Sequence, residues 1–221
     1  MPRSSAATRK RILDAAYVEF RRKGYARVGV DEIAAAAKIT KRTLYYHFDS
    51  KDALLAAVLE RQHELAILTW DAFSSKLPPR RMIAKMFEDL ISWSSQPRWA
   101  GSGFSRVAME LADLPGHPAR AVASRHKSLI ETRLAEILSR GKIASAKARA
   151  REIWLLSEGA MMCMVIHRNP HYVDAAKRAA LRLLGHPKRG HAIRSRRRAA
   201  EIHPEVSVGG ARRADVPLGR G

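Results

Sequence analysis

The chain has 221 residues, 46% of them hydrophobic, which is enough for one large domain or two modest domains and argues against global disorder. Its 41 Lys and Arg residues against 21 Asp and Glu residues give a formal net charge of +20, which favours a polyanionic partner, either nucleic acid or an acidic membrane surface. The single cysteine excludes an internal disulfide and a zinc site built from several cysteines.

The N-terminal sequence MPRSSAATRKR is polar and basic, and it is not followed by the apolar segment of a secretory signal peptide. No stretch of the sequence approaches the roughly 20 apolar residues that a membrane-spanning helix needs. We therefore expect a cytoplasmic protein without a membrane partner.

Residues 4–23 are predicted to form the first helix, and Gly24 is a suitable C-terminal stop for it. Basic residues flank an apolar stripe at helical spacing, so one face of this helix can be buried. The stripe consists of Ile12, Leu13, Ala16, Tyr17 and Phe20.

The sequence GVDEIAAAAKITKRTLYYHF, residues 29–48, indicates two short helices joined by a tight turn. The second begins at Thr40, whose hydroxyl can cap a backbone N–H group two or three residues later. Cations, hydroxyls and aromatic rings then crowd into barely two turns, which suits a helix lying in a DNA groove better than a core helix. With the first helix, this pair makes a three-helix unit of DNA-binding size. The alternative is a solvated helix-turn-helix with no DNA role.

Six further helices are predicted, the first over residues 51–76 with Ser50 as its N-cap and Pro78-Pro79 as its stop. The last two carry more apolar surface than the edge of a bundle needs, so we expect residues 146–184 to form a homodimer interface built as a four-helix bundle. The sequence shows no β pattern, and we predict an all-α fold of about nine helices. The remaining helices are expected at residues 80–95, 104–112, 120–140, 146–167 and 173–184.

Residues 186–221 lose helical periodicity and include the basic run RSRRR, a composition typical of a disordered tail. This tail either adds sequence-independent DNA affinity or has no role. We therefore divide the chain into a helix-turn-helix DNA-binding domain (residues 1–50), a helical effector-binding and dimerisation domain (residues 51–185) and the basic tail.

The segments TRKRILDAAYVEFRRKGY and DEIAAAAKITKRTLYYHFDSKDALLAAVLE resemble the N-terminal half of the TetR family (TetR/AcrR type) of bacterial one-component transcriptional regulators. The match covers roughly residues 8–60, and a weaker one over residues 100–185 resembles that family's ligand-binding and dimerisation domain. The resemblance implies a helix-turn-helix head followed by a larger helical bundle. It also implies a homodimeric repressor that binds a palindromic double-stranded DNA operator and is released by a small-molecule effector.

Two positions beside the expected DNA contacts match core residues of that family, Leu44 and Phe48. Tyr46 and Lys51 match positions that touch phosphate, and Lys51 stands at the start of the fourth helix. The expected DNA-binding residues, carried over position by position, are Thr40, Lys41, Arg42, Thr43, Tyr45, Tyr46, His47 and Lys51.

Three residues depart from the family pattern. Lys38 stands where the turn has glycine, so a positive φ has to be held by a non-glycine residue at some cost. Arg42 replaces a small residue and adds a side chain that can reach a guanine edge or a phosphate. Gly29 removes a hydroxyl cap that also touches phosphate, and no DNA contact is assigned to it.

Neither a metal site nor a cofactor is expected. Cys163 and His167 are four residues apart on one helix, but Asn169-Pro170 turns the chain away before His171. In its apolar surroundings, Cys163 is expected to be a buried thiol.

A catalytic site is not expected either. Ser102 or Ser105 with His126 and Asp113 could be arranged as a hydrolase triad, but no nucleophile-elbow motif surrounds either serine. His126 and Arg106 are instead candidate polar members of an effector cavity, whose other residues the sequence does not identify. The alternative function is a non-specific DNA-coating or architectural protein driven by the positive charge, and an enzyme comes third.

Overall fold

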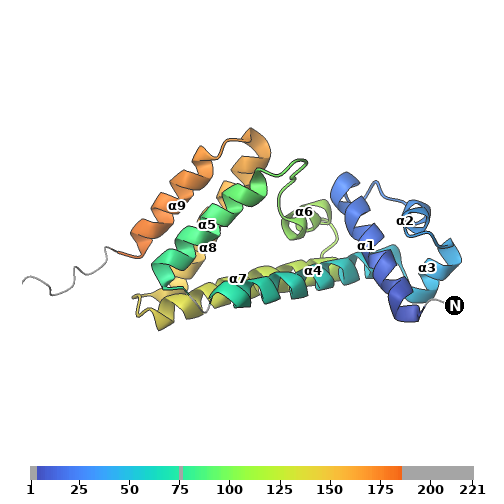
Figure 1. Ribbon diagram of the computed structural model, residues 1–221, viewed down its shortest axis with the longest axis horizontal. Helices are drawn as coiled ribbons and strands as arrows, with labels where there is room; N and C mark the ends of the chain where they lie inside the picture. The colour runs from blue at the N-terminus through green and yellow to red at the C-terminus, as the bar shows by residue number, and fades with distance from the viewer. Residues whose placement is uncertain (1–3, 75–76, 186–221) are drawn as a thin grey trace, which may run out of the picture. The chain divides into compact units, whose positions relative to one another are not determined.

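The computed structural model describes residues 4–74 and 77–185, and these residues form nine α-helices and no strand (Figure 1). The predicted all-α class is therefore confirmed for these residues, and the predicted basic tail lies outside them. The helices are α1 (Ser5–Lys23), α2 (Val30–Ala36), α3 (Lys41–His47), α4 (Lys51–Ser74), α5 (Pro79–Ser94), α6 (Gly103–Glu110), α7 (Pro118–Arg140), α8 (Ala146–His167) and α9 (His171–Leu183).

Local capping sets several of the helix boundaries, among them the predicted N-cap Ser50 and the predicted stop Gly24. The Ser4 hydroxyl accepts a hydrogen bond from the backbone N–H of Ala7 at 3.2 Å, and α1 ends at Gly24 with φ of +87°. At α4 the Ser50 hydroxyl accepts from the backbone N–H of Ala53 at 3.0 Å. Helices α5 and α7 begin one and two residues earlier than predicted, at Pro79 and Pro118. Proline is suited to the first position of a helix, where the backbone N–H has no partner within the helix.

The first of two hydrophobic clusters joins the three N-terminal helices to α4, α6 and the start of α7. Ile12, Ile33 and Leu44 bring one buried side chain from each of α1, α2 and α3, and Leu54 adds one from α4. Each such side chain contributes about 1.5–3 kcal/mol by leaving water. The three N-terminal helices therefore share one core with the first turns of α4, with α6 and with the start of α7.

The second cluster fills the other part of the unit, between α5, α7, α8 and α9. Phe87 of α5, Leu134 of α7 and Ile153 of α8 are fully or almost fully buried there. Helices α4 and α7 lie side by side and contribute residues to both clusters (Figure 1). These two helices therefore connect the surroundings of the helix-turn-helix to the rest of the bundle.

Candidate nucleic-acid interface

The turn between α2 and α3 is held by a left-handed residue, as predicted. Lys38 has φ of +55°, and the backbone N–H of Ile39 donates to the carbonyl of Ala34 at 3.0 Å. This conformation costs a residue with a Cβ about 1 kcal/mol. Gly29 is the N-cap of α2 and provides no side-chain cap. The first turn of α2 carries Asp31 and Glu32, whose negative charges interact favourably with the positive end of the helix dipole.

Helix α3 is fixed at its first turn and along one face. The Thr40 hydroxyl accepts a hydrogen bond from the backbone N–H of Thr43 at 3.1 Å, which confirms the predicted cap. Leu44 is completely buried, and Phe48, directly after the helix, is nearly so. Because these two side chains anchor the helix, its remaining side chains are held in a fixed orientation.

The structure brings seven of the expected DNA-binding residues together on and at the start of α3. Tyr46 is 81% exposed, Tyr45 is exposed, and Thr43 and His47 are half-buried. Arg42 is exposed and forms no ion pair among the described residues, so its guanidinium is available to a base edge or a phosphate.

Lys41 is exposed and pairs with Asp31 at 3.1 Å. An exposed ion pair of this kind stabilises the fold by about 1 kcal/mol or less. The Lys41 ammonium can therefore exchange this partner for a phosphate.

Lys51 has different surroundings from the residues of α3. Lys51 is the first residue of α4, and its ammonium lies 4.2 Å from the centre of the Tyr25 ring. Burial lowers the pKa of Lys51, and the carboxylates of Asp52 and Glu110 act in the opposite direction. A phosphate contact by Lys51 remains a prediction, and it would require the ammonium to leave the ring or to bind on its open side.

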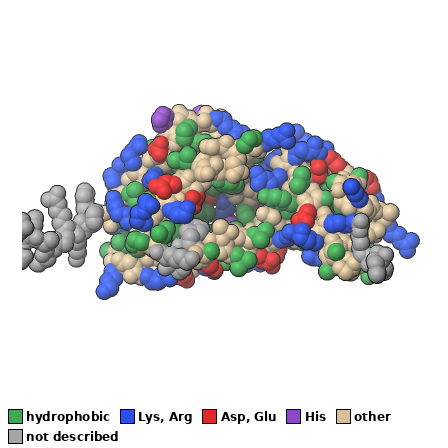
Figure 2. All heavy atoms as spheres, viewed as in Figure 1, with side chains coloured by type: hydrophobic (Ala, Val, Ile, Leu, Met, Phe, Trp, Pro, Cys, Tyr) green, Lys and Arg blue, Asp and Glu red, His purple; other side chains and the backbone are tan. Residues whose placement is uncertain are grey.

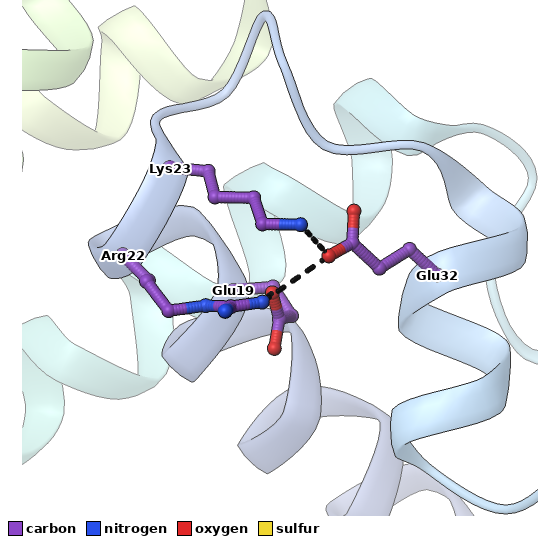
Figure 3. A network of polar contacts seen from close by, with 4 residues as sticks. All are labelled: Glu19, Arg22, Lys23 and Glu32. Atoms are coloured by element: carbon purple, nitrogen blue, oxygen red, sulfur yellow. Dashed lines mark hydrogen bonds and ion pairs between the residues drawn. The ribbon is translucent and has the colours of Figure 1, made fainter.

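A network of charged side chains joins α2 to α1 (Figure 3). Arg22 binds Glu19 at 2.5 Å and Glu32 at 3.3 Å, and Lys23 also binds Glu32. The Lys23 ammonium is the main cause of the lowered pKa of Glu32. Since Glu19 is buried on α1 and Glu32 lies on α2, the network fixes the helix-turn-helix against the first helix.

The positive charge is not gathered over one element. Lys and Arg side chains are spread over the face seen in Figure 2, interrupted by acidic and apolar side chains. The exposed face of α3, with its rings, hydroxyls and cations on a fixed helix, is therefore a more specific candidate for a nucleic-acid surface than the spread of charge alone.

A cavity of about 310 Å³ lies between α1, α4, α5, α6, α7 and α8, and Figure 2 shows the described unit hollowed near the middle of the view. Arg106 and His126, the two polar residues suggested for an effector cavity, both line it. The His126 ring stacks on Phe104 at 3.8 Å, and its Nδ1 lies 3.0 Å from Nδ1 of His63. Burial, with the charges of His63 and Lys127, lowers the pKa of His126 to about 4.

Residues 12–58 match the family described as bacterial regulatory proteins, tetR family. The chain is 42% identical over 60 residues to the HTH-type transcriptional repressor SCO4008 of Streptomyces coelicolor, which is 27% of this chain and 31% of that protein. It is 44% identical over 55 residues to the A-factor receptor protein of Streptomyces griseus, covering 25% of this chain and 20% of that one. The N-terminal part of the chain, residues 12–58, therefore belongs to the TetR family.

The likeness in sequence to these two relatives spans less than a third of their lengths. Solved structures extend the likeness in fold to most of the chain. SCO4454, a TetR-family transcriptional regulator from Streptomyces coelicolor, superposes with a TM-score of 0.73 at 24% identity, over 81% of this chain and 95% of that one. Reduced NemR of Escherichia coli superposes with a TM-score of 0.75 at 20% identity, over 82% and 100%.

One further residue of this TetR-family head lies beside α3 and was not singled out from the sequence. Arg9 is an exposed residue of α1, and its guanidinium lies 4.9 Å from the centre of the Phe48 ring at the end of α3. No local pattern identifies it, because the contact joins two helices that are far apart in sequence.

The serines considered for a triad have other roles in the helical bundle. Ser102 caps α6, with its hydroxyl 3.4 Å from the backbone N–H of Ser105, and the Ser105 hydroxyl donates to Glu158 at 3.1 Å. Asp113 is exposed after α6.

Among the described helices, none has the length and apolar character that a membrane span requires.

The prediction that Cys163 is buried is wrong for the single chain, in which this thiol is half-exposed. It borders an open hollow between α8 and α9 that also includes Leu155 and Tyr172. The apolar run around Cys163 is a helix with two different faces, and only one of them packs into the second cluster.

Proposed function

We propose that this TetR-family chain is a homodimeric transcriptional repressor that binds a palindromic operator and is released by a small-molecule effector. The observation that carries the proposal is α3, with Leu44 and Phe48 buried beneath it and Arg42, Tyr45 and Tyr46 exposed on it. Two such helices, one from each subunit, would enter successive major grooves about 34 Å apart. A DNA partner places the protein in the cytoplasm.

The exposed apolar side chains of α8 support dimerisation through α8 and α9. Leu155 is 64% and Ile166 63% exposed, an unfavourable arrangement for a free surface of a single chain. The hollow between the two helices is lined in part by small residues, Gly159, Ala175 and Ala179, which allow helices of a second copy to approach closely. A two-fold axis would make the same surface serve both subunits.

The polar contacts between α6 and the head support release by an effector. Arg106 donates to the backbone carbonyl of Arg21 at the end of α1, at 3.0 Å, and also binds Glu110 at 2.7 Å. Glu110 accepts from the backbone N–H of Tyr25 at 2.6 Å. Because these side chains also line the cavity, a molecule that moves α6 would move the end of α1. Such a molecule can act only through different affinities for the two conformations.

The proposal is tested by footprinting the DNA upstream of the chain's own gene and its neighbouring genes. We expect a protected two-fold symmetric site, with binding much tighter than to a random duplex of equal length and salt concentration. Equal affinity for both duplexes would contradict specific regulation and favour the non-specific DNA-coating alternative.

Deleting residues 186–221 separates the contribution of the basic tail. If the protein is a specific regulator, the shortened chain keeps its preference for the operator over random DNA, even if both affinities fall. The architectural alternative instead requires most of the DNA affinity to disappear with the tail, and with it the steep dependence on salt.

A further inference from the structure

The walls of the cavity are aromatic on several sides and are already ordered by neighbouring groups. Trp93 of α5, Phe104 of α6 and Trp154 of α8 all line it. The Trp93 ring meets the buried Trp99 edge to face, with centroids 5.4 Å apart, and Phe104 is held by its stacking on His126. Flat aromatic molecules pack favourably against such faces, so the apolar part of a ligand has a preformed place here.

Two carboxylates at or beside the cavity already accept a hydrogen bond on both of their oxygens and are paired with a cation. One oxygen of Glu110 accepts from Arg106 at 2.7 Å and the other from the backbone of Tyr25 at 2.6 Å. Glu158 accepts from Lys127 at 2.6 Å through one oxygen and from the Ser105 hydroxyl at 3.1 Å through the other. A cationic ligand would therefore meet carboxylates whose charge is already paired with Arg106 or Lys127.

The basic groups around the cavity have N–H donors that no described acceptor uses. Lys127 lines the cavity from α7, and Glu158 is its one hydrogen-bond acceptor among the described residues, so two of the three ammonium N–H groups remain. Its ammonium also lies 5.2 Å from the centre of the Trp154 ring. Arg21 lines the same cavity and donates to the Tyr17 hydroxyl, with no carboxylate partner within the described part of the chain.

Burial lowers the pKa of Lys127, against the opposing effect of Glu158. The single carboxylate therefore does not fully compensate the loss of water around this ammonium. A second anionic group placed beside Lys127 would improve its surroundings, and His126, kept neutral by burial, would not repel or attract that group strongly.

We propose that the cavity binds an aromatic carboxylate, with its ring against the aromatic walls and its carboxylate accepting hydrogen bonds from Lys127. The proposal rests on the proposed function, because it names the chemical class of the effector. It deepens that function by assigning a charge to the ligand: the aromatic walls select a flat apolar body, and the remaining donors of Lys127 select an anionic head.

The test compares three probes that share one ring system and differ in the charge of the head: naphthalenecarboxylate, naphthalenemethanol and naphthylmethylammonium. Binding to the full chain is measured by calorimetry at neutral pH without DNA. We expect the carboxylate to bind at least about tenfold more tightly than the alcohol, because hydrogen bonds from an ammonium to an ionised carboxylate are stronger than those to a neutral hydroxyl. The ammonium should bind most weakly.

The double variant Lys127→Met with Glu158→Gln removes both charges of the buried pair and leaves no carboxylate unpaired. In this variant the carboxylate and the alcohol should bind with equal affinity. Lys147→Met is the matched control, since Lys147 is an exposed lysine on α8, and it should keep the full preference. Far-ultraviolet circular dichroism establishes that each variant is folded, and the comparison of the three probes on the unaltered chain does not depend on any variant.

Tighter or equal binding of the alcohol or the ammonium, or no binding of the carboxylate at millimolar concentration, would overturn the proposal. A carboxylate preference that survives the double variant would overturn the role of Lys127. These outcomes leave the repressor proposal standing, because operator footprinting of the unliganded chain tests that proposal separately.

Discussion

The side-chain carboxylate of Glu110 accepts a hydrogen bond from the backbone N–H of Tyr25 at 2.6 Å, although 85 residues separate them in sequence. The contact ties the last residue of α6 to the loop that follows α1. Replacing Glu110 with alanine would leave the Tyr25 N–H group and the Arg106 guanidinium without this acceptor.

We expect Glu110→Ala to lower the free energy of unfolding by about 1–3 kcal/mol, since it removes one acceptor shared by two partly buried donors. Urea denaturation measures this change. Glu136→Ala is a matched control on α7, because it removes a carboxylate with no hydrogen bond to the described residues, and it should alter stability by no more than about 0.5 kcal/mol. Equal effects of the two substitutions would contradict the role assigned to the Tyr25 contact.

Arg42→Ala should weaken operator binding without changing stability. The side chain is exposed on α3 and has no ion-pair partner among the described residues, so the fold loses almost nothing. If Arg42 reaches a guanine edge, the loss in operator affinity should be about 1–3 kcal/mol and specificity at one base pair should relax.

The matched control for Arg42 is Arg140→Ala, which removes the same charge from the exposed end of α7. Fluorescence anisotropy with operator and random duplexes measures both variants. A uniform loss on both duplexes would indicate that Arg42 contacts phosphate instead, and no loss would remove it from the interface.

Lys38→Gly should stabilise the chain, by roughly 0.5–1 kcal/mol, because the residue is held at φ of +55° and glycine adopts this conformation without a Cβ penalty. Lys142 has nearly the same φ, +54°, in the turn after α7. Lys142→Gly should therefore give a similar gain in stability, measured by thermal unfolding. Only Lys38 lies beside α3, so only Lys38→Gly should alter DNA affinity. A loss of stability in both variants would contradict the strain argument.

Stability should fall as the pH decreases from about 6.5 to about 4, in part through His126. Burial lowers the pKa of this residue to about 4 in the folded chain. Between the two values the unfolded chain binds a proton at His126 that the folded chain does not, so acid favours unfolding. Urea denaturation at about pH 7.5 and about pH 5 measures the effect, and His126→Gln should reduce the difference.

Features set by neighbouring residues were predictable from the sequence. The Thr40 cap and the stop at Gly24 each depend on a few consecutive residues and on the rules for caps and turns. The positive φ of Lys38 was implied by the resemblance to the TetR family, whose turn has glycine at this position. The burial of Leu44 and Phe48 beneath α3 follows from helical spacing and from the resemblance to the TetR family.

Features set by contacts between distant segments were not predictable. The position of the Lys51 ammonium over the Tyr25 ring depends on how α4 meets the loop after α1. The lining of the cavity depends on how six helices pack, so only Arg106 and His126 could be suggested beforehand. The half-exposure of Cys163 has the same origin, since periodicity shows that α8 has an apolar face without showing what covers it.

The first hydrophobic cluster sets how this protein can be divided for engineering. Because Phe104 and Val107 of α6 and Val122 of α7 pack with the core of the three N-terminal helices, these helices are not an interchangeable cassette. In a chimera that exchanged only residues 4–50 with a relative, the relative's helices would have to pack against the α6 and α7 side chains of this chain, which do not match them. Transplanting DNA specificity into another scaffold is therefore better done by exchanging the exposed side chains of α3 alone.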